Sequence, residues 1–148
     1  MRTITAIMPI EVLLVEDNPG DAQLTRIALE DSKISIHLNV VEDGVEAMAF
    51  LRKQEKYAKV AHPHIVLLDL NLPRKDGREV LAEIKGDKNL KRIPVVILTT
   101  SQAEEDILKA YNLYANCYIT KPVDFDEFVK IVQSIENFWF AIVKLPPE

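Results

Sequence analysis

The sequence predicts an α/β fold in which a doubly wound sheet of five parallel strands carries helices on both faces. Three observations support this prediction. Five short runs rich in Val, Ile and Leu recur along the 148 residues, helical patterns lie between them, and the central runs are almost continuously apolar. Such continuous runs are typical of strands that are covered on both faces, and alternation with helices indicates βα units around a parallel sheet.

The strand candidates differ in polarity, and this difference predicts their place in the sheet. The second run contains His37 and Asn39 and therefore suits an edge, whereas the first, third and fourth runs suit the centre. The five predicted strands are 12–15, 37–41, 65–68, 94–98 and 117–119.

Each strand is followed by a helical pattern with a recognisable start. Proline near the start and Asp, Ser or Asp-Gly at the caps mark these beginnings. The predicted helices are 19–31, 44 to about 53, 78–85, Ser101 through 113, and a last helix that Asp124 caps. The stretch 54–63 has no clear period, so we expect a surface excursion there.

Size and composition indicate one domain, which we expect to span residues 1–139, followed by a C-terminal extension at 140–148. The 18 basic and 23 acidic residues give a charge of −5, which disfavours nucleic-acid binding. The single cysteine, Cys117, is expected to be an inert strand residue and fits a reducing compartment, so we expect a cytoplasmic location. We expect neither a signal peptide nor a membrane span.

Polar residues follow the predicted strands at their carboxyl ends, where ligand sites lie in open parallel sheets. They are Glu16, Asp17, Asp69, Thr99 and Lys121. Three carboxylates about 5 Å apart repel each other by roughly 3 kcal/mol per pair at an effective dielectric constant of 20, so the site requires a cation. Mg²⁺ is the expected ion, because it prefers oxygen ligands and commonly bridges carboxylates to a phosphoryl group.

A carboxylate in this setting can act as a nucleophile toward phosphorus and form an acyl phosphate. Asp69 is the candidate nucleophile, and Glu16 and Asp17 would share the metal with it. Lys121 would pair with the phosphoryl oxygens, and Thr99 would hydrogen-bond another of them.

These residues occur within longer segments that resemble the receiver domains of two-component response regulators, over about residues 10–139. The spacings fit this family as well, with 99 − 69 = 30 residues from Asp69 to Thr99 and 121 − 99 = 22 from Thr99 to Lys121. The matching segments are Val15-Glu16-Asp17-Asn18, Leu68-Asp69-Leu70-Asn71-Leu72-Pro73, Asp76-Gly77, Thr99-Thr100-Ser101 and Lys121-Pro122.

The resemblance implies a flavodoxin-like strand order 2-1-3-4-5 and a phosphorylation switch rather than an enzyme. Asp69 would accept a phosphoryl group from a sensor histidine kinase, and the backbone carbonyl of Asn71 would be a further metal ligand. Thr99 and Tyr118 match the two switch positions, which would bias a contact surface made by the fourth helix, fifth strand and fifth helix. Lys121-Pro122 would form a cis peptide.

A more detailed resemblance points to the cyanobacterial phytochrome-associated response regulators, which implies a phytochrome kinase as partner. The shared features include Lys75-Asp76-Gly77-Arg78-Glu79-Val80-Leu81 and a Phe138-Trp139 ending. Thr100 departs from the family, where many receivers have a smaller residue, and the stretch 54–63 is longer than in a minimal receiver. By the resemblance, Asn71 and Ser101 occupy positions that tune autodephosphorylation.

The end of the chain predicts a protein contact. Apolar residues cover about half of the last predicted helix, more than the roughly 100° arc that a helix needs to pack on its own sheet. Phe138, Trp139 and Phe140 extend this surface, so we expect a homodimer that uses them and the C-terminal arm. The alternative is that these aromatic residues close the domain's own core. Only nine residues follow Trp139, too few for a DNA-binding or enzymatic domain.

Two other functions remain open at this level. An aspartate-nucleophile phosphatase would share the acyl phosphate, but that class has a second Asp two residues after the nucleophile, where this chain has Asn71. A binding module that is independent of phosphorylation would not need Asp69, Thr99 and Lys121. We expect His37, His62 and His64 to be solvated or structural and not to form a metal site.

Overall fold

Five parallel strands form one sheet in the order β2-β1-β3-β4-β5, which confirms the predicted topology and the edge position of the second strand. The computed structural model describes residues 9–30, 35–70, 72–99, 117–120, Asp126 and Lys130, with the backbone alone at 99 and 117–120. The elements are β1 Ile10–Val15, α2 Pro19–Glu30, β2 Ile36–Val41, α3 Gly44–Leu51, the 3₁₀ turn η1 Glu55–Tyr57, β3 Ile65–Asp69, α4 Gly77–Gly86, β4 Val95–Thr99 and β5 Cys117–Thr120.

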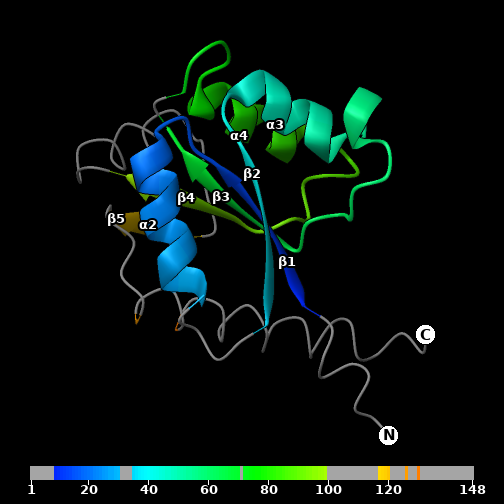
Figure 1. The fold of residues 1–148 in the computed structure, drawn as a ribbon. Helices are drawn as coiled ribbons and strands as arrows, with labels where there is room; N and C mark the ends of the chain where they lie inside the picture. Colours follow the sequence, from blue (N-terminus) through cyan, green and yellow to red (C-terminus); the bar gives the residue numbers. More distant parts are fainter. Residues whose placement is uncertain are drawn as a thin grey trace, which may run out of the picture.

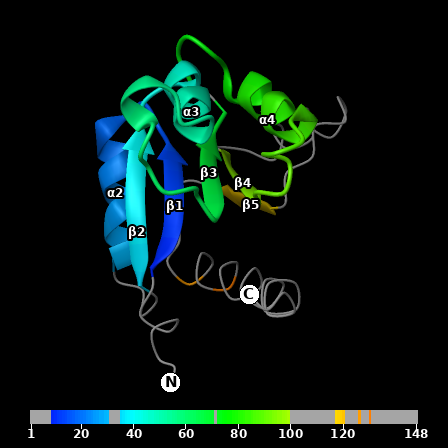
Figure 2. The same cartoon turned by 90° about the vertical axis from the view of Figure 1, so that its right-hand side faces the viewer.

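The described helices lie on opposite faces of the sheet. Helix α2 covers one face, and α3 and α4 cover the other, as Figures 1 and 2 show from two directions. Because successive strand residues point to opposite faces, neighbours such as Leu13 and Leu14 enter different core clusters. This arrangement explains why the central strands are apolar at every position.

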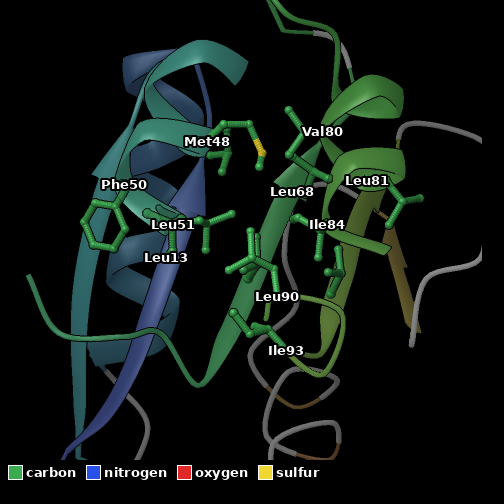
Figure 3. Close-up of a cluster of buried hydrophobic side chains, with 14 of the residues drawn as sticks. Leu13, Met48, Phe50, Leu51, Leu68, Val80, Leu81, Ile84, Leu90 and Ile93 are labelled. Carbon is green, nitrogen blue, oxygen red and sulfur yellow. The ribbon is translucent and has the colours of Figure 1, made fainter. Parts of the chain in front are cut away.

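The larger core cluster lies between the sheet and helices α3 and α4 (Figure 3). Met48, Phe50 and Leu51 come from α3, and Val80 and Ile84 come from α4. Met48 extends toward Val80, whereas Phe50 lies on the side away from α4 (Figure 3). The smaller cluster packs Leu29 of α2 against the other face of the sheet, which includes Leu14, Leu67 and Leu98. Both sides of strands β1 and β3 are therefore fixed by packing.

Side-chain caps determine where the helices begin. Asp76 starts α4 with a reciprocal capping box, in which Glu79 binds the Asp76 backbone N–H. Asp43 caps α3 by accepting a hydrogen bond from the Glu46 N–H at 2.8 Å. The Asn18 side chain accepts a hydrogen bond from the Asp21 N–H at 2.9 Å in the first turn of α2.

The excursion at 54–63 is anchored to the core more firmly than its sequence indicates. Tyr57 in η1 packs against Phe50, with ring centroids 5.2 Å apart, and its hydroxyl donates to the Glu46 carboxylate at 2.5 Å. Burial raises the pKa of the Tyr57 phenol, and the hydrogen bond from Tyr57 lowers the pKa of Glu46. The pair therefore stays a neutral phenol donating to a charged carboxylate.

The predicted strands can all be compared with the structure, but the last two predicted helices fall largely outside the described residues. The five strands match the predicted runs to within two residues at each end. The predicted helix 101–113 lies outside the described residues, and of the last predicted helix only Asp126 and Lys130 are described, both helical and exposed. Within the described parts of the chain, we find no helix whose length and apolar character would let it cross a bilayer.

Replacing Ile84 by Ala should lower the free energy of unfolding by about 2 to 5 kcal/mol, because this fully buried side chain fills the space between α4 and the sheet. Urea denaturation measures the difference. Lys88→Ala, at an exposed position, is the control and should change stability by less than about 0.5 kcal/mol. A loss as small as the control's would show that this core cluster is packed loosely.

Candidate metal centre and phosphoacceptor site

Three carboxylates converge at the carboxyl end of the sheet. One oxygen from each of Glu16, Asp17 and Asp69 lies within 4.8 Å of the others, and among the described residues no other group of this kind is found. Glu16 and Asp69 are buried, at 2% and 4% exposure, whereas Asp17 is exposed. The site therefore has two enclosed carboxylates and one that faces solvent.

Parallel pairing of β1 with β3 brings these residues together. Val15 pairs with Leu68, so the chain leaves β1 at Glu16 beside the point where β3 ends at Asp69. From this end of the sheet, β1 connects to α2 on one face and β3 connects to α4 on the other. This divergence of the connections is where open α/β sheets bind their ligands.

Local hydrogen bonds orient the residues after β1. The backbone N–H of Glu16 donates to the Val41 carbonyl at 3.0 Å, which ties it to the end of β2. The Asn18 N–H donates to Oε2 of Glu16 at 3.3 Å. The Glu16 carboxylate is thus held by the same short loop that starts α2.

Close packing fixes the backbone at Asp69. A Cβ placed on Gly77 would lie 2.4 Å from the Asp69 carbonyl oxygen and 2.6 Å from Cα of Leu70. The Gly77 N–H also donates to the Leu70 carbonyl at 3.0 Å. Sequence reasoning treated Gly77 as part of a helix start and missed this contact. Its position directly after the capping residue Asp76 was the available signal.

The donor set fits a small, hard divalent cation. All the side-chain donors are carboxylate oxygens, which Mg²⁺ prefers over nitrogen or sulfur ligands. The mutual repulsion of three carboxylates in a partly buried site would also be relieved by such an ion. Glu16, Asp17 and Asp69 are therefore the residues that would hold it.

The other predicted site residues can be placed only partly. The backbone of Thr99 ends β4 and pairs with Thr120, and Tyr118 pairs with Ile97. The strand ends therefore put position 99 at the same end of the sheet as Asp69. Six further predicted residues lie outside the described residues: Asn71, Ser101, Lys121, Phe138, Trp139 and Phe140. So do Thr100 and the predicted cis peptide Lys121-Pro122.

Two of the three histidines contact Glu11, which lies near the start of β1 and away from the carboxylate cluster. Nδ1 of His37 lies 2.7 Å from Oε1 of Glu11. Nδ1 of His64 accepts a hydrogen bond from the Glu11 backbone N–H at 2.9 Å. Both contacts tie neighbouring strands to Glu11 in β1, which is a structural role.

The family model for the response regulator receiver domain matches residues 12–133. The matched range covers the described sheet except for the first two residues of β1, and it contains all three clustered carboxylates. The chain therefore belongs to the response regulator receiver family, and the fold and the acidic site agree with this assignment.

Among individual relatives, the response regulator Rcp1 of Synechocystis sp. is 51% identical over 93% of this chain and 94% of its own length. The crystal structure of the phosphorylated cyanobacterial phytochrome response regulator RcpA matches with a TM-score of 0.73 and 51% identity, covering 90% of this chain and 96% of that one. A Mn²⁺-bound form of Rcp1 matches with a TM-score of 0.71, covering 93% and 99%.

Replacing Asp69 by Asn should raise the metal-free free energy of unfolding by about 1 to 3 kcal/mol, because it removes one charge from the repelling cluster. Mg²⁺ should raise the melting temperature of the wild type more than that of the variant. Chemical denaturation and thermal melting with and without Mg²⁺ measure both effects. Glu55→Gln removes an exposed charge outside the cluster. Its metal-free stability and its gain in melting temperature with Mg²⁺ should match those of the wild type. A metal-free Asp69→Asn protein less stable than wild type would contradict the repulsion.

Proposed function

We propose that this protein is a phosphorylation switch in which Asp69 accepts a phosphoryl group from a sensor histidine kinase. The observation that carries the proposal is the placement of Asp69, buried at the end of β3 with its carboxylate beside those of Glu16 and Asp17. Membership of the receiver family supports the same conclusion.

In the proposed reaction, a carboxylate oxygen of Asp69 attacks phosphorus of the donor phosphohistidine. The new O–P bond forms an acyl phosphate while the N–P bond breaks, and the leaving imidazole nitrogen takes up a proton. The reaction is a transfer between two proteins, so the chain itself is not a turnover enzyme. Its own reactions would be limited to self-phosphorylation from phosphodonors and slow autodephosphorylation, in which water takes up the phosphoryl group.

The proposed metal ligands are Glu16, Asp17, Asp69 and the backbone carbonyl of Asn71. When bound, Mg²⁺ would neutralise charge that develops on the transferring phosphoryl oxygens. The phosphoryl group would be carried by Asp69 at the end of β3. Glu16 and Asp17 follow β1, so they would remain available as metal ligands after the transfer.

Lys121 and Thr99 are the proposed partners of the phosphoryl group itself. The Lys121 ammonium would pair with one phosphoryl oxygen, and the Thr99 hydroxyl would hydrogen-bond another. Movement of Thr99 toward the phosphate would leave space for Tyr118 to rotate. This movement would bias the contact surface made by the fourth predicted helix, β5 and the last predicted helix, and so transmit the signal.

The proposed kinase partner is a phytochrome, because the similar protein RcpA is described as a phytochrome response regulator. We place this transfer in the cytoplasm, which also suits the single cysteine, Cys117. The negative net charge argues against DNA as the output partner.

Incubation with acetyl phosphate and Mg²⁺ should add the mass of one phosphoryl group to the wild-type protein. The adduct should be absent in Asp69→Asn, because the nucleophilic oxygen is lost, and in samples treated with EDTA. Intact-mass spectrometry detects it. Asp126→Asn is the matched control, since it makes the same change at an exposed helical position and should still be phosphorylated. An adduct that persists in Asp69→Asn would exclude Asp69 as the acceptor.

The same samples separate the competing functions. Steady-state release of phosphate from phosphomonoesters would favour the phosphatase, whereas the switch predicts a single slow turnover of its own acyl phosphate. Absence of any adduct would favour a binding module that is independent of phosphorylation. Transfer from a purified phytochrome kinase, followed by the same mass measurement, tests the partner.

We also propose that the receiver domain spans residues 1–139 and that residues 140–148 form an arm that supports a homodimer. The proposed contact uses Phe138, Trp139 and Phe140, whose aromatic area is the kind that dominates protein interfaces. The alternative remains that these side chains close the core of a monomer.

Sedimentation equilibrium distinguishes these possibilities. The intact chain should have the mass of a dimer, and a chain that ends before Phe138 should have the mass of a monomer, because the aromatic contact surface has been removed. Trp139→Ala should weaken the dimer without truncation. Equal monomeric masses for the intact and shortened chains would exclude the proposed dimer.

A further inference from the structure

The first turn of α3 touches the loop that follows the phosphoacceptor. A Cβ placed on Gly44 would lie 2.0 Å from the Lys75 carbonyl oxygen and 2.7 Å from its carbonyl carbon. Gly44 does not have a positive φ, so glycine is needed here for space rather than for backbone conformation. The loop backbone is thus packed directly on α3, with no room for a side chain.

An ion pair joins the same two segments. Asp43 is buried, and its two carboxylate oxygens have different partners. One oxygen caps α3 at the Glu46 N–H, and the other lies 3.2 Å from Nη1 of Arg74. Arg74 has a φ of 65°, a left-handed conformation that is uncommon for residues other than glycine and that needs surrounding contacts to persist.

Hydrogen bonds of the described residues constrain the loop between Asp69 and α4. Two of them each close a short turn, from the Leu72 N–H to the Leu70 carbonyl at 3.1 Å and from the Lys75 N–H to the Pro73 carbonyl at 2.7 Å. Leu72 packs against the larger core cluster. The Gly77 N–H closes the loop on the Leu70 carbonyl at 3.0 Å, so a shift forced at Lys75, two residues earlier, would reach Leu70 and Asp69.

We propose that Asp43 and Gly44 are positioning residues for the metal centre. They hold loop residues Leu72 to Asp76 against α3, and this keeps the Asp69 carboxylate in place for a divalent cation. That Asp69 binds the cation rests on the proposed function. Neither positioning residue touches the metal, so each acts only through the loop.

The test compares Gly44→Ala with Gly86→Ala in the full chain. Both changes add one methyl group to a helix, but a Cβ on Gly86 meets no atom within 4 Å. Mn²⁺ binding, followed by the electron paramagnetic resonance signal of the free ion, should be about tenfold weaker in Gly44→Ala and unchanged in Gly86→Ala, as expected for a residue that orients metal ligands. Metal-free urea denaturation of both proteins reports packing separately.

If Gly44→Ala binds Mn²⁺ as tightly as Gly86→Ala does, the inference is wrong, even if its metal-free stability falls. Should Gly44→Ala fail to fold, the Arg74 variants decide. Arg74 is largely exposed, at 58% of its side chain, so Arg74→Ala is expected to fold. It should weaken Mn²⁺ binding by about two- to fivefold, and Arg74→Lys should restore most of the affinity because it keeps the charge. Equal Mn²⁺ affinities in the wild type, Arg74→Ala and Arg74→Lys would overturn the proposal.

The outcome is separable from the proposed phosphorylation. If acetyl phosphate gives no adduct on the wild type but Gly44→Ala still weakens Mn²⁺ binding, the proposed function fails and the positioning role stands. If the wild type is phosphorylated on Asp69 while the variants bind Mn²⁺ equally well, only the positioning role fails.

Discussion

The main constraint on this structure is that acidic side chains of like charge are held close together at one end of a parallel sheet. Glu16 and Asp69 are both buried, and their oxygens lie within 4.8 Å of each other and of Asp17. Such a cluster opposes folding, because each pair of charges repels in a medium that screens poorly. The apolar packing on both faces of β1 and β3 offsets this repulsion. A divalent cation would turn the same arrangement into a favourable one, which couples the metal to stability.

Rigidity around Asp69 comes from backbone contacts at which a side chain would not fit. Gly77 lies against the Asp69 carbonyl, and Gly44 lies against the Lys75 carbonyl, so helices α4 and α3 both press on the loop that follows β3. Lys75 and Arg52 also pair with Glu83 of α4, which adds a partly exposed ion-pair network between the loop, the end of α3 and α4. The acidic centre is therefore supported by the half of the domain that contains the larger core cluster.

Most of the fold could be predicted because it depends on short-range patterns. Continuous apolar runs identified the buried strands, and the polar second run identified the edge strand. This works because the number of buried faces of a strand determines which of its positions must be apolar. The excursion at 54–63 was harder. Tyr57 anchors it through Phe50 and Glu46. A contact made by one aromatic residue produces no periodic pattern in the sequence, so it could not be predicted from that stretch.

By itself, the sequence determined which residue types stand at the strand ends, and hence the acidic character and expected metal of the site. The sequence also predicted that Glu16, Asp17 and Asp69 converge, but only the tertiary structure fixed how closely their oxygens approach, because that depends on the register of β1 against β3. The tertiary structure also decided the contact of Asp43 with Arg74, which are 31 residues apart. Helix caps and strand runs are local properties of the chain, whereas close approach between distant backbones arises only when the layers pack.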